Sequence, residues 1–586
     1  MQLTNREIAR RLGRVADLLE IAGENAFRVR AYRNAADTVG ELASPLTSEV
    51  EAGADLTALP HIGRDIAGQI ETLVREGRLP ALDEVARQVP PELADLMAVR
   101  GLGPKGVKAL HDRFRVQSLD ELEALARAGR TRELPGFGAK KEAALIAGIE
   151  GLRAQDQQRT RRADAEALVE PVRAHLAALA GVEWVEVAGS YRRQCDTVGD
   201  VDVVVACADP VAVMAALVEV PGIERVVSQG DTRATVILDG GLQLDARAVE
   251  PAAAGAALLY FTGSQAHNVA LRQRARERGY RLNEYGLVSD AGAVAAGGDE
   301  TAIYQALGLA WIPPELREGG DEIAAAAAGR LPELVTTAGI RGNLHGHTDW
   351  SDGRDSLAAM VAAARERGFD YLAITDHGPL VRVANGLSAQ RLQQQIEVIR
   401  RLDAELEDID LLAGCEVDIH ADGTLDLPDE VLAQLDVVVC SIHYHLRQSR
   451  AEQTERVLRA MDNPHFMIWG HPTAREINRR EPIDVDLDAC FAAAAARGIA
   501  IEINAQPKRL DIDARGARLA LAHGCRLCVN TDAHRTEHLD LFRHGIGQAR
   551  RAGAEAVDVI NTWSLAALRA GLRPDRAAGR AAHESG

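Results

Sequence analysis

Apolar side chains recur every three or four positions through the first 80 residues, and this pattern predicts helices. Ile8, Leu12 and Val15 fall on one face of the first helix, because an α-helix returns to the same side after 3.6 residues. The stretch Phe27 to Arg33 predicts a second, short helix that carries three arginines. The chain therefore begins with a helical region.

A Gly-rich turn that opens a helical pattern occurs three times before residue 150. Such a turn exposes the first backbone N–H groups of the helix, which can bind a DNA phosphate without reading the base sequence. One copy alone is more typical of an ordinary helical hairpin, but here three copies occur, each with a cation just after the turn. The candidate DNA-binding residues are Gly63, Gly101, Gly103, Lys105, Gly136, Gly138 and Lys140.

The pattern changes to strands at residues 185–187 and 201–205, on either side of a turn at Gly189 and Ser190. Side chains two apart on a strand share a face, so Asp200 and Asp202 point to the same side. Adjacent carboxylates repel strongly unless a divalent cation lies between them. A metal site is therefore favoured over the alternative, a solvent-exposed Asp-x-Asp strand.

A third acid, Asp245, lies on another strand pattern after a Gly-Gly turn. Arg192 and Arg193 follow the Gly-Ser turn, and these cations with free backbone N–H groups suit a phosphate. Three aspartates, two metal ions and a polyphosphate form a two-metal phosphoryl-transfer centre, where one ion activates the attacking oxygen and the other stabilises the leaving group.

Residues 340 to 575 alternate short apolar strands with helical segments, which predicts a parallel βα barrel. In such a barrel the functional residues lie where the strands end. One His at a strand end is commonly a core or capping residue, but six strand ends here finish in a His or an acid, and this indicates a polynuclear metal centre. The candidate ligands are His345, His347, Asp352, His377, Glu416, His443, His471, Asp532 and His534.

Composition limits the class of protein. A chain of 586 residues is too long for one core, so we expect three to five domains. The net charge of −19 argues at first against a nucleic-acid partner, but four of the five lysines lie at the Gly-rich turns, and local patches of charge decide phosphate binding.

We expect no membrane span and no signal peptide, and the seven scattered cysteines favour a reduced, cytoplasmic protein. The spacing of Cys525 and Cys528 leaves a redox motif as the less favoured alternative to an apolar strand.

The Gly-Ser turn, the Asp-x-Asp strand and the third Asp resemble the palm of family X DNA polymerases. The motifs Tyr260-Phe-Thr-Gly-Ser264 and Leu282-Asn-Glu-Tyr-Gly286 narrow the resemblance to this family. It implies catalysis by Asp200, Asp202 and Asp245 through Mg²⁺ or Mn²⁺, and binding of a deoxynucleoside triphosphate. The implied nucleotide-binding residues are Gly189, Ser190, Arg193, Tyr260, Phe261, Gly263, Asn268 and Arg272.

The N-terminal helices resemble the lyase-like region of the same family, with one departure. Members that remove a 5′-deoxyribose phosphate use a Lys in the helix after the first hairpin to form a Schiff base. Gln69 occupies that position, and Gln cannot form the imine. We therefore expect little or no lyase activity.

The nine barrel residues resemble the ligand set of the polymerase-and-histidinol-phosphatase (PHP) domain. Mixed His and carboxylate ligands suit Zn²⁺, Mn²⁺ or both, with up to three ions and Glu416 as the bridge. Ions in such a site activate water toward a phosphodiester or phosphomonoester.

The two resemblances cover nearly the whole chain, in the order of bacterial family X DNA polymerases with a C-terminal PHP domain. They imply a template-directed polymerase that fills short gaps in DNA repair, joined to a 3′–5′ exonuclease or related DNA phosphoesterase. One alternative is that the polymerase half binds DNA without synthesising it, so that the PHP phosphoesterase is the active part. Another is that the PHP domain is purely structural. The expected partners are gapped or primer-template DNA and dNTP, and the expected state is a monomer.

The predicted fold is a multidomain assembly of α+β and α/β parts. It comprises helix-hairpin-helix domains, a palm with a mixed sheet, a small α+β nucleotide-binding domain and a distorted TIM-like barrel. Residues 150 to 180 predict a linking helix broken at Pro171. The predicted divisions are 1–80, 81–150, 151–251, 252–318, a linker at 319–339, the PHP domain at 340–575 and a tail at 576–586.

Overall fold

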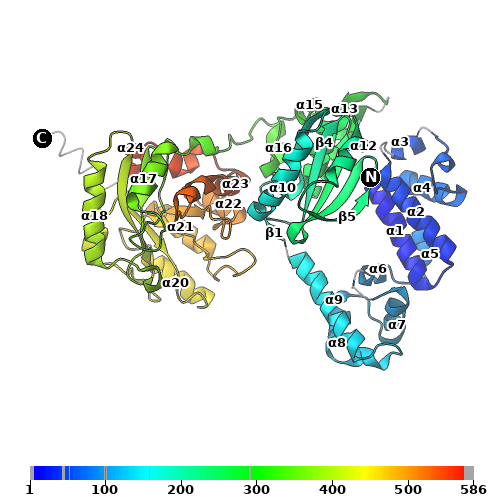
Figure 1. The fold of residues 1–586 in the computed structure, drawn as a ribbon, viewed down its shortest axis with the longest axis horizontal. Coiled ribbons are helices and arrows are strands. Elements are labelled where there is room, and N and C mark those ends of the chain that lie inside the picture. Colours follow the sequence, from blue (N-terminus) through cyan, green and yellow to red (C-terminus); the bar gives the residue numbers. More distant parts are fainter. Residues whose placement is uncertain are drawn as a thin grey trace.

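The computed structural model describes residues 5–42, 46–51, 53–97, 99, 102–157, 159–289 and 292–572. Gly101 and the predicted tail 576–586 lie outside the described residues. Figure 1 shows a barrel with its outer helices on one side of a central sheet and the N-terminal helices on the other side.

The N-terminal region is helical, as predicted, and Ile8, Leu12 and Val15 are fully buried. The second helix is longer than the predicted Phe27–Arg33 segment, because the buried side chains of Tyr32 and Val39 continue its apolar face. The helices are α1 (Asn5–Ala22), α2 (Ala26–Glu41), α3 (Leu46–Glu51), α4 (Arg64–Glu76), α5 (Pro80–Ala86), α6 (Leu93–Leu96), α7 (Pro104–Phe114), α8 (Leu119–Arg127) and α9 (Ala139–Gln157).

Each Gly-rich turn lies directly before a helix. Gly63 and Gly103 are the N-cap residues of α4 and α7, and Gly138 precedes α9. The described glycines of these turns are exposed, and so are Lys105 and Lys140. The helix N-termini and their cations are therefore accessible to a phosphate backbone.

The central sheet is mixed, as predicted. Its order is β2-β4-β7-β6-β5, and β4 and β7 run parallel whereas the other pairs are antiparallel. Val204 of β4 packs on Ala257 and Leu258 of α13 (Pro251–Thr262). Asp200 and Asp202 share the face of Val204, so both carboxylates point toward α13. The strands are β2 (Val182–Val187), β4 (Asp200–Cys207), β5 (Ile223–Gln229), β6 (Arg233–Leu238) and β7 (Gln243–Val249), and α12 (Pro210–Leu217) covers the opposite face.

The predicted break at Pro171 is wrong. Helix α10 (Arg162–Ala177) continues through Pro171. Proline removes one backbone hydrogen bond, but the buried side chains of Val169 and Val172 keep this helix packed on the sheet. The connection is instead interrupted between α9 and β1 (Thr160–Arg161), which pairs with β3 (Thr197–Val198).

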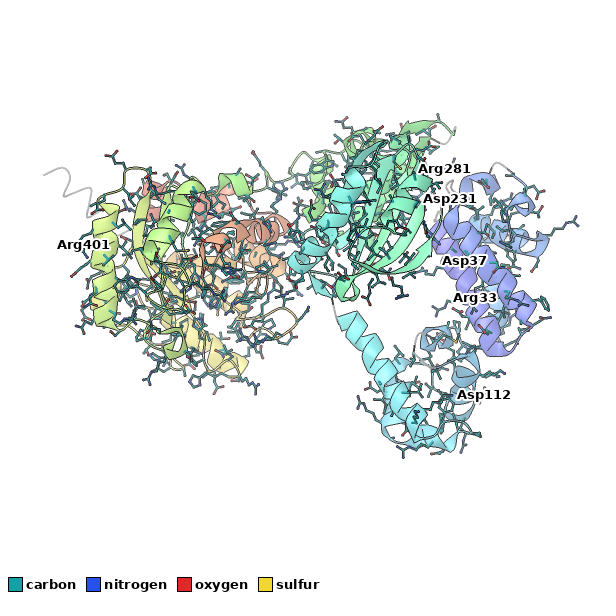
Figure 2. The ribbon with its side chains drawn as sticks, in the orientation of Figure 1. Arg33, Asp37, Asp112, Asp231, Arg281 and Arg401 are labelled. Atoms are coloured by element: carbon teal, nitrogen blue, oxygen red, sulfur yellow. The ribbon has the colours of Figure 1, made fainter. Side chains whose placement is uncertain are left out.

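A smaller α+β unit follows the sheet. The antiparallel strands β8 (Tyr280–Asn283), β9 (Gly286–Ser289) and β10 (Val294–Ala296) pack with α13, α14 (Gln265–Glu277), α15 (Glu300–Ala306) and α16 (Glu322–Ala327). Tyr285 Oη donates to the carbonyl of Leu42 at 3.1 Å, which joins this unit to the N-terminal helices. Figure 2 labels Arg33 and Asp37 on α2 and, across from them, Arg281 on β8 of this unit and Asp231 on the β5–β6 turn of the central sheet.

The C-terminal region confirms the predicted parallel barrel. Its seven strands follow one another in chain order, and Thr531 N donates to Asn343 Oδ1 at 3.0 Å across the nearly closed seam. The strands are β11 (Gly342–Asn343), β12 (Tyr371–Ile374), β13 (Asp410–Asp418), β14 (Val437–Ser441), β15 (Ile468–Trp469), β16 (Ala500–Asn504) and β17 (Leu527–Asn530). The helices are α17 (Leu357–Glu366), α18 (Ala389–Asp403), α19 (Asp429–Leu432), α20 (Arg450–Ala460), α21 (Leu487–Arg497), α22 (Ala514–Ala522), α23 (Phe542–Ala552) and α24 (Leu565–Leu572).

Within the part of the chain that the structure describes, no helix is both long enough and apolar enough to cross a bilayer.

Candidate active sites

A cavity of about 470 Å³ lies between the central sheet and helices α13 and α14, within the size range of small-molecule sites. It is lined by two of the three predicted catalytic acids and by every predicted nucleotide-binding residue. The lining residues are Arg10, Arg159, Gly189, Ser190, Arg193, Asp200, Asp202, Tyr260, Phe261, Gly263, Gln265, Asn268 and Arg272.

Gly189 allows the Gly-Ser turn to lie against the aspartates. Its φ is +62°, and a Cβ at this position would lie 2.9 Å from Asp202 Oδ2. Any other residue would be strained in this conformation and would also strike the carboxylate. The glycine therefore lets α11 (Gly189–Arg192) begin directly beside Asp202.

Asp245 stands beside Asp202 in the parallel register of β4 and β7. Its carboxylate accepts hydrogen bonds from Thr235 Oγ1 at 2.5 Å and from Gln243 Nε2 at 2.8 Å. Within the described part of the chain, Asp245 does not line the cavity. The structure thus gathers Asp200 and Asp202 in the cavity and holds Asp245 next to them, oriented by Thr235 and Gln243.

A buried ionic network holds Arg192, which directly follows the Gly-Ser turn in α11. Glu300 accepts from Arg192 at 2.8 and 2.9 Å and from Arg317 at 2.8 and 3.2 Å. Burial raises the pKa of Glu300, but the two guanidinium groups outweigh burial and bring this pKa to about 2. The sequence reasoning did not identify Glu300 or Arg317, because their pairing with Arg192 arises from chain segments far apart.

Two cavity residues were also missed. Arg10 comes from α1 and Arg159 from the segment before β1. Arg159 donates to Thr197 Oγ1 at 2.9 Å, which holds its guanidinium near the aspartate strand. Arg10 lies on the solvent side of the helical pattern, so nothing local distinguishes it from other surface arginines.

The barrel brings all nine predicted ligands together at the ends of its strands. Among the described residues, the groups of His, Cys, Asp and Glu whose donor atoms all lie within 4.8 Å of one another occur at this one site. The groups are His347, Asp352, His377 and His534; His345, His347 and Asp532; and His377, Glu416 and His443. His471 joins through Nε2, which lies 2.9 Å from Glu416 Oε1.

Glu416 is the centre of this cluster. The carboxylate is 1% exposed, and Oε2 lies 2.8 Å from His377 Nδ1 and 3.4 Å from His345 Nε2. Oε1 faces His471 and, at 3.4 Å, His443 Nε2. One carboxylate therefore contacts imidazoles from several strands, as a bridging ligand would.

The donor set fits divalent cations. Both oxygens of Glu416 and ring nitrogens of His345, His347, His377 and His471 are buried without a hydrogen-bond partner, and such unpaired groups are costly unless they bind something. Burial lowers the pKa of His347 to about 4, helped by His534 and His377. Burial raises the pKa of Glu416, but the surrounding histidines outweigh it and hold this pKa well below the ordinary value. Burial lowers the pKa of His377, but Glu416 and Asp352 outweigh burial and bring this pKa to about 9. A bound cation would displace that proton, because neutral imidazole and ionised carboxylate are the forms that bind metal.

Two buried acids orient the predicted ligands, and the sequence reasoning missed them. Glu502 Oε1 accepts from His345 Nδ1 at 2.8 Å, and Asp418 Oδ2 accepts from His443 Nδ1 at 3.0 Å. Such partners fix the ring and its tautomer, leaving the other nitrogen for metal. Each acid interrupts an apolar strand, and this pattern could have identified them.

Five family models match successive parts of the chain. They are a helix-hairpin-helix domain at residues 3–79, a SAM-like helix-hairpin-helix tandem at 93–150, the DNA polymerase beta palm at 159–237, the DNA polymerase beta thumb at 257–318 and the PHP domain at 343–506.

Curated proteins match over different shares of the chain. The DNA polymerase/3′-5′ exonuclease PolX of Bacillus subtilis (strain 168) is 35% identical over 571 residues, which span 97% of this chain and 99% of that protein. A probable phosphatase of Syntrophotalea carbinolica is 27% identical over 39% of this chain and 94% of its own length. A probable phosphatase of Thermoanaerobacter sp. (strain X514) is 28% identical over 37% of this chain and 89% of its own length.

Proposed function

The chain belongs to the bacterial family X DNA polymerases that carry a C-terminal PHP domain, and from this premise we propose that it fills short gaps in DNA during repair and also removes nucleotides from 3′ ends. The observation that carries the proposal is that one chain holds two separated sites suited to phosphoryl chemistry, the aspartate cavity and the His-rich barrel site. Both kinds of domain depend on metal ions.

In the polymerase site, Ser190 and Arg193 bind the triphosphate of an incoming dNTP. Tyr260, Phe261 and Asn268 border its sugar and base, and Arg272 lies against the nascent pair. Asp200, Asp202 and Asp245 would hold Mg²⁺ or Mn²⁺, which would orient the primer 3′-hydroxyl toward the α-phosphate. Bound cations there stabilise the charge that develops on the transferring group. The parallel register places Asp245 beside Asp202, and this supports a shared role for the two carboxylates.

In the PHP site, the nine residues hold up to three Zn²⁺ or Mn²⁺ ions. Such ions supply an activated water for attack on a phosphodiester. The chain contributes an enclosed donor cluster in which Glu502 and Asp418 fix His345 and His443. These contacts keep the ligands oriented before a 3′ end arrives.

DNA is the partner, and we propose that the exposed turns at Gly63, Gly103 and Gly138 contact its backbone without base specificity. Lys105 and Lys140 add charge beside two of these turns. The described cysteines are all free thiols, which supports a reducing, cytoplasmic location. We propose a monomer with the domain divisions given above.

The test is a duplex with a short gap, incubated with the full chain and dNTPs in Mg²⁺ or Mn²⁺. The proposal expects template-directed extension, and it expects shortening of the primer when dNTPs are withheld. A chain that degrades the primer and never extends it would instead be a phosphoesterase whose polymerase half only binds DNA.

A further inference from the structure

The turn that carries the candidate triphosphate ligands continues directly into a segment docked on the PHP barrel. Ser190 and Arg193 line the cavity, and the next residues, Gln194 to Asp196, lie against α23 and the loop after His471. Figure 1 shows α23 on the side of the barrel that faces α10 and β1. The nucleotide site therefore rests partly on the other catalytic domain.

Arg193 and an arginine of the barrel bind the same carboxylate, that of Glu318. Its Nη1 donates to the carbonyl of Thr262 at 2.6 Å, and its Nε donates to Glu318 Oε1 at 3.3 Å. Arg551 of α23 donates through Nη2 to the same oxygen at 3.2 Å. Glu318 thus lies between a triphosphate-binding arginine and a PHP arginine.

Asp196 provides the second link. Its Oδ2 accepts from Arg475 Nη2 at 2.7 Å, and its Oδ1 lies 3.6 Å from Arg551 Nη1. The side chains of Arg475, Asp196 and Arg551 are 14%, 19% and 18% exposed, so solvent screens these pairs much less than surface pairs. Arg475 also donates to the carbonyl of Arg509 at 2.9 Å, which fixes it within the barrel loops.

The packing at this contact is close. Gln194 lies on Gly547 of α23, where a Cβ would come within 2.9 Å of Gln194 Oε1 and 3.3 Å of its Cβ. Gln194 also has a φ of +59°, a conformation that non-glycine residues adopt rarely. The docked segment is therefore fixed in one conformation by its neighbours.

We propose that Arg551, assisted by Arg475, is a positioning residue for nucleotide binding in the polymerase site. Glu318 and Asp196 place two negative charges beside a site for a polyanion, and the two PHP arginines balance them. Without Arg551, Glu318 pairs with Arg193 alone and draws its guanidinium away from the triphosphate. The PHP domain then sets the dNTP affinity of the polymerase as well as performing its own chemistry.

This inference rests on the proposed polymerase function. The experiment measures single-nucleotide insertion on a gapped duplex and 3′ degradation without dNTPs, in the full-length wild type and in Arg551→Met. We expect the KM for dNTP to rise roughly tenfold, equivalent to about 1.4 kcal/mol, with kcat changed by less than about twofold, because binding rather than the chemical step is affected. The exonuclease rate stays at the wild-type value.

Three further variants test whether the change in KM depends on the contact between Arg551 and Glu318. Arg543→Met removes a charge from the same helix, where Arg543 pairs with Glu166 of α10 at 3.5 Å; its KM should equal that of the wild type. Arg551→Lys should recover part of the affinity. Adding Glu318→Gln to Arg551→Met should restore the KM to within about threefold, since the unbalanced carboxylate is gone.

The outcomes separate the two claims. A wild type that inserts no nucleotide refutes the polymerase function. A wild type that inserts nucleotide while Arg551→Met keeps the same KM refutes the positioning role alone. A parallel fall of insertion and exonuclease in Arg551→Met, with no rescue by Glu318→Gln, means that Arg551 only maintains the fold and also overturns the proposal.

Discussion

Removing metal should strongly destabilise the PHP barrel, because its centre is a buried cluster of ligands with unpaired atoms. The group of His345, His347 and Asp532 shares no residue with the group of His377, Glu416 and His443, so two ions can bind without competing for a donor. An ion present at a thousand times its dissociation constant stabilises the folded state by about 4 kcal/mol, and two such ions by about 8 kcal/mol. For a domain of this size, 1 kcal/mol corresponds to roughly 2–4 °C.

We therefore expect chelation to lower the Tm of the barrel by at least about 15 °C. Glu416→Gln removes a carboxylate that contacts histidines of both groups, so at least about half of this metal-linked stabilisation should disappear. Scanning calorimetry with saturating Zn²⁺ or Mn²⁺, and then with chelator, measures the shift, and elemental analysis counts the bound ions.

Glu142→Gln is the matched control. Glu142 is a buried carboxylate (3% exposed) in the N-terminal region, bonded to Thr131 and Arg132, so this variant should keep the full metal response of the barrel. An unchanged melting temperature of the wild-type barrel with and without metal, or wild-type metal content in Glu416→Gln, would contradict a stabilising metal centre.

Three other predictions concern separate parts of the chain. Glu300 has a folded pKa of about 2 against an ordinary 4.5, so its stabilisation is complete above about pH 4.5 and is lost as pH falls toward 2. Glu300→Gln should cost about 3–5 kcal/mol at pH 7, and urea midpoints of the two proteins should converge on acidification; a gap that stays constant would contradict the assignment. Replacing Lys105 and Lys140 with Met should reduce the slope of log affinity against log salt by about 0.9 per lost phosphate contact, whereas Arg401→Met, on the outer helix α18 (Figure 2), should leave the slope unchanged. Borohydride trapping on DNA with a 5′-deoxyribose phosphate should yield no covalent adduct, because Gln69 has no amine and its Oε1 instead accepts from Ala81 N at 2.9 Å; an adduct would reveal another lysine at work.

The sequence predicted features that depend on local periodicity. Asp200 and Asp202 lie two apart on a strand, and the barrel ligands each follow an apolar strand, so their grouping follows from the fold class alone. The extent of α2 and the continuity of α10 through Pro171 were mispredicted, because buried neighbours outweigh local propensity at both places.

The supporting residues could not be predicted in the same way. Arg10 reaches the cavity from the first helix, and Arg551 reaches Glu318 from a helix more than 200 residues away in the chain. Nothing in their immediate sequence separates them from other arginines. Their roles come from packing between domains, which a single sequence does not encode in any short pattern.

The chain is proposed to act on DNA through two separate metal-dependent centres. The most direct measurement is a gapped-duplex assay that scores extension and degradation together in wild type, Asp202→Asn and Glu416→Ala. We predict that Asp202→Asn loses extension and keeps degradation, and that Glu416→Ala does the reverse. Loss of both activities in either variant, with the fold intact, would contradict the existence of two separate centres.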